Sequence, residues 1–152
     1  MSGQPQKIER KGWIKFRPDY CIGCQACLLI CPLNHEGVIG YDLSRIFWIS
    51  GGFEEVNKGK PAFCVQCANP KCYYACPVDA IYIDNKTGAR CIDPEKCNGC
   101  KKCIEACPFK PPRISFDSKR GIAIKCDLCG GDPKCVEICP NEALSYVRKK
   151  EK

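Results

Sequence analysis

Cysteine placement constrains this chain more than any other feature of its sequence. Sixteen of its seventeen cysteines fall into four groups of four, and a proline follows the last cysteine of every group. The groups are Cys21, Cys24, Cys27 and Cys31; Cys64, Cys67, Cys72 and Cys76; Cys97, Cys100, Cys103 and Cys107; and Cys126, Cys129, Cys135 and Cys139. Because 12 prolines and 13 glycines interrupt the 152 residues, few apolar segments are long enough for large helices. The cysteines themselves must therefore organise the core.

The first and third groups have the spacing C-x2-C-x2-C-x3-C-P. That spacing is typical of bacterial ligands for cubane iron–sulfur clusters, in which three cysteines of one loop bind one cluster and the fourth binds its neighbour. We expect the fourth cysteine at the start of a following short helix, because proline suits a first helical turn. The sequence predicts four [4Fe-4S] clusters and an apoprotein that is largely unfolded without them.

Zinc and disulfides are the alternative uses of grouped cysteines. An isolated C-x2-C pair could belong to a tetrahedral zinc site. A zinc site does not need a third cysteine two residues later or the C-x3-C-P ending, and here both features recur in the same order. Tight triplets also make poor disulfide cross-links. The pattern therefore favours iron–sulfur ligation.

The formal charge of +7 would ordinarily suggest a nucleic-acid or anionic partner. That charge counts the cysteines as neutral thiols. A cubane core of +2 held by four thiolates carries about −2, so four clusters contribute about −8 and leave the holoprotein near −1. We therefore expect no nucleic-acid partner, and we interpret most of the basic residues as local compensation for the clusters.

Membrane and export signals are absent from the sequence. No run of about 20 apolar residues occurs, so we expect no membrane insertion. The segment before Lys11 has neither a hydrophobic signal region nor a twin-arginine pair. We expect a cytoplasmic location.

Short strands and turns alternate with the cysteine groups. The predicted strands are 80–84 with 89–93, 113–117 with 122–124, and 12–17 with 143–147. The first two pairs flank turn sequences and form hairpins, whereas the third pair joins the two ends of the chain.

Spacing alone leaves open which groups form a ferredoxin-like pair, since 20 residues separate groups two and three and 18 separate groups three and four. Groups two and four have lengthened loops that contain Asn69-Pro70 and Gly130-Gly131-Asp132-Pro133. Over residues 20–140 the chain resembles the four-cluster electron-transfer subunits of molybdenum and tungsten pterin oxidoreductases. This resemblance implies that groups two and three form one module and that groups one and four form the other.

The resemblance also implies crossed ligand sets. Cluster 1 would be held by Cys21, Cys24, Cys27 and Cys139; cluster 2 by Cys126, Cys129, Cys135 and Cys31; cluster 3 by Cys64, Cys67, Cys72 and Cys107; and cluster 4 by Cys97, Cys100, Cys103 and Cys76. The implied fold is α+β, a small, loop-rich, double bacterial-ferredoxin-like fold whose two pseudo-symmetric lobes of short hairpins and helices surround four cubane clusters.

We expect a single polyferredoxin unit over residues 1–152 rather than separable domains. The outer lobe would comprise residues 12–63 and 121–147, and the inner lobe about 64–120. Residues 1–11 and 148–152 are expected to be flexible tails.

A narrower likeness lies in Asn34-His35-Glu36-Gly37 and the following Ser44-Arg45-Ile46. This segment resembles small subunits paired with tungsten aldehyde oxidoreductases and their relatives, including complexes that reduce benzoyl-CoA. The likeness implies a subunit that relays single electrons between a catalytic tungsten or molybdenum pterin subunit and a further redox subunit or carrier. Alternatives are a subunit of a carbon monoxide dehydrogenase, hydrogenase or formate dehydrogenase system, a freely diffusing polyferredoxin, and a mainly structural module.

Nothing in the sequence indicates substrate chemistry, because there is no dinucleotide fingerprint, P-loop or histidine-based nucleophile constellation. We therefore expect no catalytic residue. The seventeenth cysteine, Cys91, lies in a predicted strand and is expected to be a small buried hydrophobe rather than a redox thiol. His35, the only histidine, is expected to make a structural hydrogen bond in the loop between groups one and two.

Overall fold

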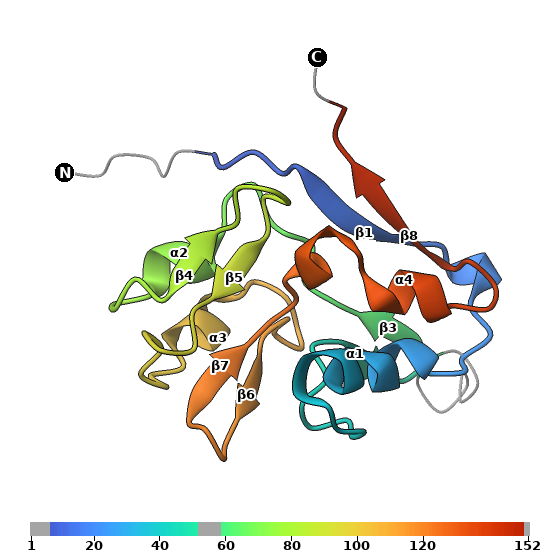
Figure 1. The fold of residues 1–152 in the computed structure, drawn as a ribbon, viewed down its shortest axis with the longest axis horizontal. Coiled ribbons are helices and arrows are strands. Elements are labelled where there is room, and N and C mark those ends of the chain that lie inside the picture. The colour runs from blue at the N-terminus through green and yellow to red at the C-terminus, as the bar shows by residue number, and fades with distance from the viewer. Residues whose placement is uncertain (1–6, 52–58, 151–152) are drawn as a thin grey trace.

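The computed structural model describes residues 7–51 and 59–150 and consists of short helices and two-stranded sheets (Figure 1). The strands are β1 (Gly12–Phe16), β2 (Phe47–Ile49), β3 (Lys60–Ala62), β4 (Ile81–Ile83), β5 (Arg90–Ile92), β6 (Ser115–Asp117), β7 (Ile122–Ile124) and β8 (Leu144–Arg148). The helices are α1 (Ala26–Glu36), α2 (Lys71–Ala75), α3 (Lys102–Ala106) and α4 (Lys134–Ile138), with 3₁₀ turns η1 (Pro18–Tyr20) and η3 (Leu128–Gly131). The composition is α+β, as predicted.

Each sheet is one antiparallel pair of strands. β4 pairs with β5, β6 pairs with β7, and β1 pairs with β8, so all three predicted pairings are confirmed. The pairing of β2 with β3 was not predicted. Both strands have only three residues, and Pro61 at the centre of β3 cannot donate a hydrogen bond to the ladder, so the segment carries little strand signal.

The expected position of the helices relative to the cysteines is wrong. α2, α3 and α4 each contain the third cysteine of a group and end one residue before the fourth. Cys76, Cys107 and Cys139 then have extended backbone angles. The following proline explains this, because its ring disfavours a helical conformation in the residue before it. The Cys-Pro pair therefore ends these helices instead of starting them.

Helix α1 is the exception, because it continues through Cys31-Pro32. It ends at Gly37, whose positive φ of 69° and N–H bond to the carbonyl of Leu33 form a left-handed cap. The extra length carries Asn34 and His35 past the end of the cysteine group.

Helices pack in two pairs, α1 with α4 and α2 with α3. Figure 1 shows α2, α3 and β4 to β7 on one side of the molecule and α1, α4, β1 and β8 on the other. The larger apolar core includes Ile14, Leu28 and Leu144, and the smaller one is formed by Ile81, Cys103, Ile114 and Ala123. The exact lobe boundaries stay a prediction.

The predicted tails lie partly outside the described residues, which exclude 1–6 and 151–152. Within the described part, the N–H of Ile8 bonds the carbonyl of Ala68 at 2.7 Å. The N–H of Lys149 bonds the carbonyl of Lys11 at 2.8 Å, which extends the β1–β8 ladder.

Two glycines with nearly the same positive φ provide a test of close packing in this fold. Gly99 has φ +73° and Gly121 has φ +66°, but an added Cβ would lie 2.3 Å from the Gly121 carbonyl oxygen at Gly99 and would meet nothing within 4 Å at Gly121. Left-handed backbone costs a residue with a Cβ about 1–2 kcal/mol at either position. We predict that Gly99→Ala accelerates loss of visible absorbance on anaerobic heating far more than Gly121→Ala. Equal rates would contradict the predicted clash.

Candidate metal centres

Three cavities are each lined by four cysteines drawn from two groups. Site A is lined by Cys21, Cys24, Cys27 and Cys139; site C by Cys64, Cys67, Cys72 and Cys107; and site D by Cys76, Cys97, Cys100 and Cys103. In each cavity three cysteines come from one group and the last comes from its partner group. These are combinations that the resemblance implied for clusters 1, 3 and 4, and ligation by them stays a prediction.

The other four grouped cysteines, Cys31, Cys126, Cys129 and Cys135, are called site B. Burial, followed by the negative charges of Cys129 and Cys31, raises the pKa of Cys135. The charge of Cys135 likewise helps to raise the pKa of Cys126, after burial. Cys31 from group one is therefore close to the cysteines of group four.

The cysteine that closes each group accepts a backbone hydrogen bond. The donors are the N–H groups of Arg45 to Cys31 at 3.4 Å, and of Ala80 to Cys76, Arg113 to Cys107 and Ala143 to Cys139, each at 3.3 Å. N–H donors directed at a thiolate stabilise its charge and are one of the means by which a protein tunes a cluster. The feature occurs at all four Cys-Pro pairs, which supports a shared role for those cysteines.

Thiol burial tests whether these sites fit an iron–sulfur cluster. Burial raises the pKa of Cys27 to about 12, and repulsion from Cys24, Cys139 and Cys21 adds to that shift. Burial also raises the pKa of Cys103 to about 11. Buried sulfurs that repel their neighbours in this way favour a positive centre among them, and metal binding supplies that centre as it releases the thiol protons. The donor sets therefore fit [4Fe-4S] clusters.

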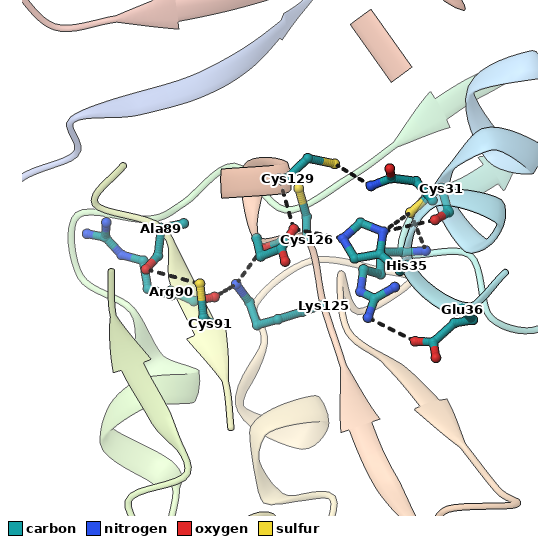
Figure 2. Close-up of polar contacts among 12 residues, drawn as sticks. Cys31, His35, Glu36, Ala89, Arg90, Cys91, Lys125, Cys126 and Cys129 are labelled. Carbon is teal, nitrogen blue, oxygen red and sulfur yellow. Dashed lines mark hydrogen bonds and ion pairs between the residues drawn. The ribbon is translucent and has the colours of Figure 1, made fainter. Parts of the chain in front are cut away.

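His35 links group one to group four, as Figure 2 shows. Its Nδ1–H donates to the carbonyl of Cys31 and its Nε2–H to a carboxylate oxygen of Asp127, both at 2.9 Å. Burial lowers the pKa of His35, but hydrogen bonds to Asp127, Cys129 and Cys31 outweigh that effect and raise it to about 12. The expected structural hydrogen bond is confirmed, although His35 lies in α1 and not in a loop.

Cys91 behaves as predicted. It lies in β5, is 7% exposed, and its thiol contacts the carbonyl of Ala89 at 3.7 Å. Burial raises the pKa of this thiol to about 11, which keeps it protonated. Cys91 lines none of the cavities of sites A, C and D.

The buried side chains of Gln66, Arg90 and Lys125 were missed by the sequence analysis. Gln66 donates from Nε2 to the carbonyl of Cys126 at 3.0 Å and accepts the N–H of Arg90 at 2.9 Å. Lys125 donates from Nζ to the carbonyls of Arg90 and Cys126 (Figure 2). Together they connect the group-two loop, β5 and group four. The available signals were the position of Gln66 between two ligand cysteines and of Lys125 directly before one.

Within residues 7–51 and 59–150, no helix has the length and apolar character required to cross a bilayer.

Two family models match this chain. The 4Fe-4S dicluster domain family matches residues 58–149, and a 4Fe-4S binding domain matches residues 18–42. The first match covers more than half of the chain, so this protein belongs to the 4Fe-4S dicluster domain family. It binds several [4Fe-4S] clusters, and the sixteen grouped cysteines supply enough ligands for four.

Curated relatives have names that connect them with oxidoreductase systems. The aliphatic sulfonate oxidoreductase, polyferredoxin-like subunit, of Pyrococcus furiosus is 45% identical over 123 residues, which are 81% of this chain and 68% of the relative. The formate dehydrogenase iron-sulfur subunit of Wolinella succinogenes is 32% identical over 78% of this chain and 62% of its own. The hydrogenase-2 operon protein HybA of Escherichia coli O157:H7 is 30% identical over 71% of this chain.

The chain spans only 40% of HybA, so that relative is considerably longer. Taken together, the relatives identify this protein as an iron–sulfur electron-transfer subunit of the kind found in oxidoreductase systems.

Solved structures show the same fold. The active site complex BamBC of benzoyl coenzyme A reductase contains a chain that matches with a TM-score of 0.52 and 21% identity, over 93% of this chain and 78% of that one. The same complex bound to benzoyl-CoA gives a TM-score of 0.51 over 81% of its chain.

Removal of iron should unfold the protein, because the bonds between iron and the buried cysteines supply much of the folding free energy. We predict that chelation of the anaerobic holoprotein abolishes most far-ultraviolet circular dichroism and makes the chain sensitive to protease. It should also expose Cys91, which is not a predicted ligand, to a thiol reagent. Holoprotein incubated without chelator is the control. An apoprotein that stays protease-resistant and keeps Cys91 protected would contradict this prediction.

Proposed function

We propose that this protein is a non-catalytic subunit that relays single electrons through four [4Fe-4S] clusters. One end of the relay would serve a catalytic pterin subunit of the tungsten aldehyde oxidoreductase type, and the other a second redox subunit or carrier. The clusters would occupy sites A to D, which correspond to the predicted clusters 1 to 4, and would supply one-electron redox chemistry. A cytoplasmic location is part of the proposal.

One observation carries the proposal, namely that the cysteine sites form a continuous series. The negative charge of Cys27 in site A helps to raise the pKa of Cys135 in site B, after burial. Cys64 in site C acts on Cys126 in site B, and Cys72 in site C acts on Cys103 in site D. These neighbours support the order A, B, C, D. A relay needs such an order, whereas clusters that serve only as structural cross-links do not.

Exposed apolar residues support entry of electrons at site A. Among the described residues, six of the nine exposed large hydrophobic side chains lie between positions 20 and 41. They are Tyr20, Ile22, Leu33, Val38, Ile39 and Tyr41. Ile22 is 61% exposed and also lines the cavity of site A. Because aromatic and apolar side chains are common in the centres of interfaces, we propose that the catalytic subunit docks on this segment.

A second candidate for the partner is an oxidoreductase that acts on aliphatic sulfonates. The 45% identity to the Pyrococcus furiosus subunit favours it over formate dehydrogenase and hydrogenase partners.

Anaerobic affinity purification from the source cell tests the partner. We expect a large pterin-containing subunit to copurify with tungsten, and substrate assays of that complex then separate aldehydes from sulfonates. A molybdenum enzyme, a carbon monoxide dehydrogenase or a hydrogenase in its place would replace the tungsten assignment. Recovery of the chain alone with its iron intact would instead favour a freely diffusing polyferredoxin.

Crossed ligation predicts a specific pattern of substitution effects. Cys27→Ser and Cys139→Ser should perturb the same cluster signal in electron paramagnetic resonance, although the two residues lie in different groups. Cys31→Ser should perturb a different signal from Cys27→Ser, although these two lie in the same group. Cys91→Ser is the matched control and should leave the iron content and all four signals unchanged. If Cys27→Ser and Cys31→Ser altered one common signal, the crossed sets would be wrong.

A further inference from the structure

The cavities of sites A, C and D differ sharply in charge although each presents four cysteines. The cavity of site C is lined by Lys71, Arg90, Arg113 and Lys125 and, among the described residues, by no Asp or Glu. The cavity of site D has one charged lining residue, Lys101, which is exposed. The described residues around site A include none.

Two of the cations at site C are buried. Arg90 is 0% exposed and Lys125 is 3% exposed. The Arg90 guanidinium donates to the carbonyls of Gly88 and Ile8, but its Nε has no hydrogen-bond partner among the described residues. An ammonium has three N–H donors, and two carbonyl acceptors, of Arg90 and Cys126, surround Nζ of Lys125. Each cation therefore retains an N–H group that could donate a hydrogen bond to a sulfur at site C.

Lysine and arginine side chains are positively charged at neutral pH, and Arg90 and Lys125 both line the cavity that is also lined by the four cysteines of site C. Because buried charges are poorly screened, the two cations act on site C far more strongly than a surface lysine would.

Site B shares Lys125 with site C, because its Nζ bonds the Cys126 carbonyl, but Arg90 lines the cavity of site C, and the other cations near site B are paired with carboxylates. His35 bonds Asp127 at 2.9 Å, and Arg45 bonds Glu36 at 3.2 Å. These pairs carry little net charge. Among the four sites, site C therefore has the largest uncompensated positive charge in buried surroundings.

We propose that Arg90 and Lys125 form a buried cation pair that stabilises the reduced state of site C and gives it the most positive reduction potential of the four sites. Reduction adds one electron and no compensating ligand, so the negative charge at the site increases by one. Arg90 and Lys125 offset that increase, and site C becomes the position where an electron entering the relay comes to rest. The proposal depends on the cluster assignment under the proposed function.

A potentiometric titration of the anaerobic holoprotein, followed by electron paramagnetic resonance with dithionite as reductant, tests this inference. Cys67→Ser alters a ligand of site C and identifies which reduction step belongs to that site. We expect this step to be the most positive of the four in the wild-type protein. If another site in the wild-type protein had a more positive reduction potential than site C, the proposal would be overturned.

Lys125→Met removes the charge while preserving much of the side-chain volume. It should lower the equilibrium constant for one-electron reduction of site C at least tenfold, which corresponds to a shift of about 59 mV toward negative potential. Lys125→Arg keeps the positive charge and should therefore keep the wild-type potential of site C. A role of Lys125 in packing alone does not predict this result, because arginine has a different shape. The matched control is Lys101→Met, because Lys101 lines the cavity of site D but is exposed to solvent, and no step should move.

Arg90→Gln provides an independent variant if Lys125→Met does not fold, and it should shift the same step in the same direction. A shift confined to another site, or no shift in a variant that retains all four clusters, would overturn the inference. Iron analysis of each sample separates this outcome from failure of the proposed function. A wild-type chain whose total iron is too low to fill four [4Fe-4S] clusters would contradict the cluster assignment itself.

Discussion

Repulsion among buried thiolates is the constraint on which the rest of this structure depends. The cysteines approach one another closely enough that each site contains sulfurs whose negative charges disfavour ionisation of their neighbours, as at Cys27 and Cys135. Burial strengthens this effect because the surrounding dielectric is low. When an iron–sulfur core binds between the cysteines, its positive charge attracts all of these thiolates. The folded chain and its clusters are therefore one thermodynamic unit, and the short helices and two-stranded sheets do not need to be stable alone.

Local geometry follows from how each cysteine group must present its sulfurs. A helix of five residues carries the third cysteine in α2, α3 and α4, and the Cys-Pro pair ends it with extended backbone at the fourth. That change of direction lets the fourth cysteine leave its own loop and line the cavity of a partner group. A backbone N–H then meets its sulfur. In groups two, three and four the proline thus accounts for the helix end and the change of direction, whereas in group one Cys31 reaches group four from within α1.

The sequence permitted prediction of features that have local causes. Spacing identified the sixteen grouped cysteines, and turn residues located the β4–β5 and β6–β7 hairpins. The β2–β3 pair escaped because its strands are short and one contains Pro61. Gln66, Arg90 and Lys125 escaped for a different reason. Their residue types are ordinarily exposed, and only the convergence of segments distant in sequence buries them, with Gln66 and Lys125 at the carbonyl of Cys126 and Arg90 at the carbonyls of Gly88 and Ile8.

Sites with the same four ligands can differ in reduction potential only through their surroundings, since cluster type and ligand charge are then equal. Hydrogen bonds to the closing cysteines do not distinguish the sites, because all four have one. Charge does distinguish them, with no charged residue among those described at the cavity of site A and two buried cations at that of site C. Lys125 also bonds the carbonyl of Cys126, which belongs to site B. Lys125 therefore has two roles. It stabilises the contact between sites B and C, and its charge makes the surroundings of the four sites unequal. A substitution of Lys125 changes the packing and the reduction potential together.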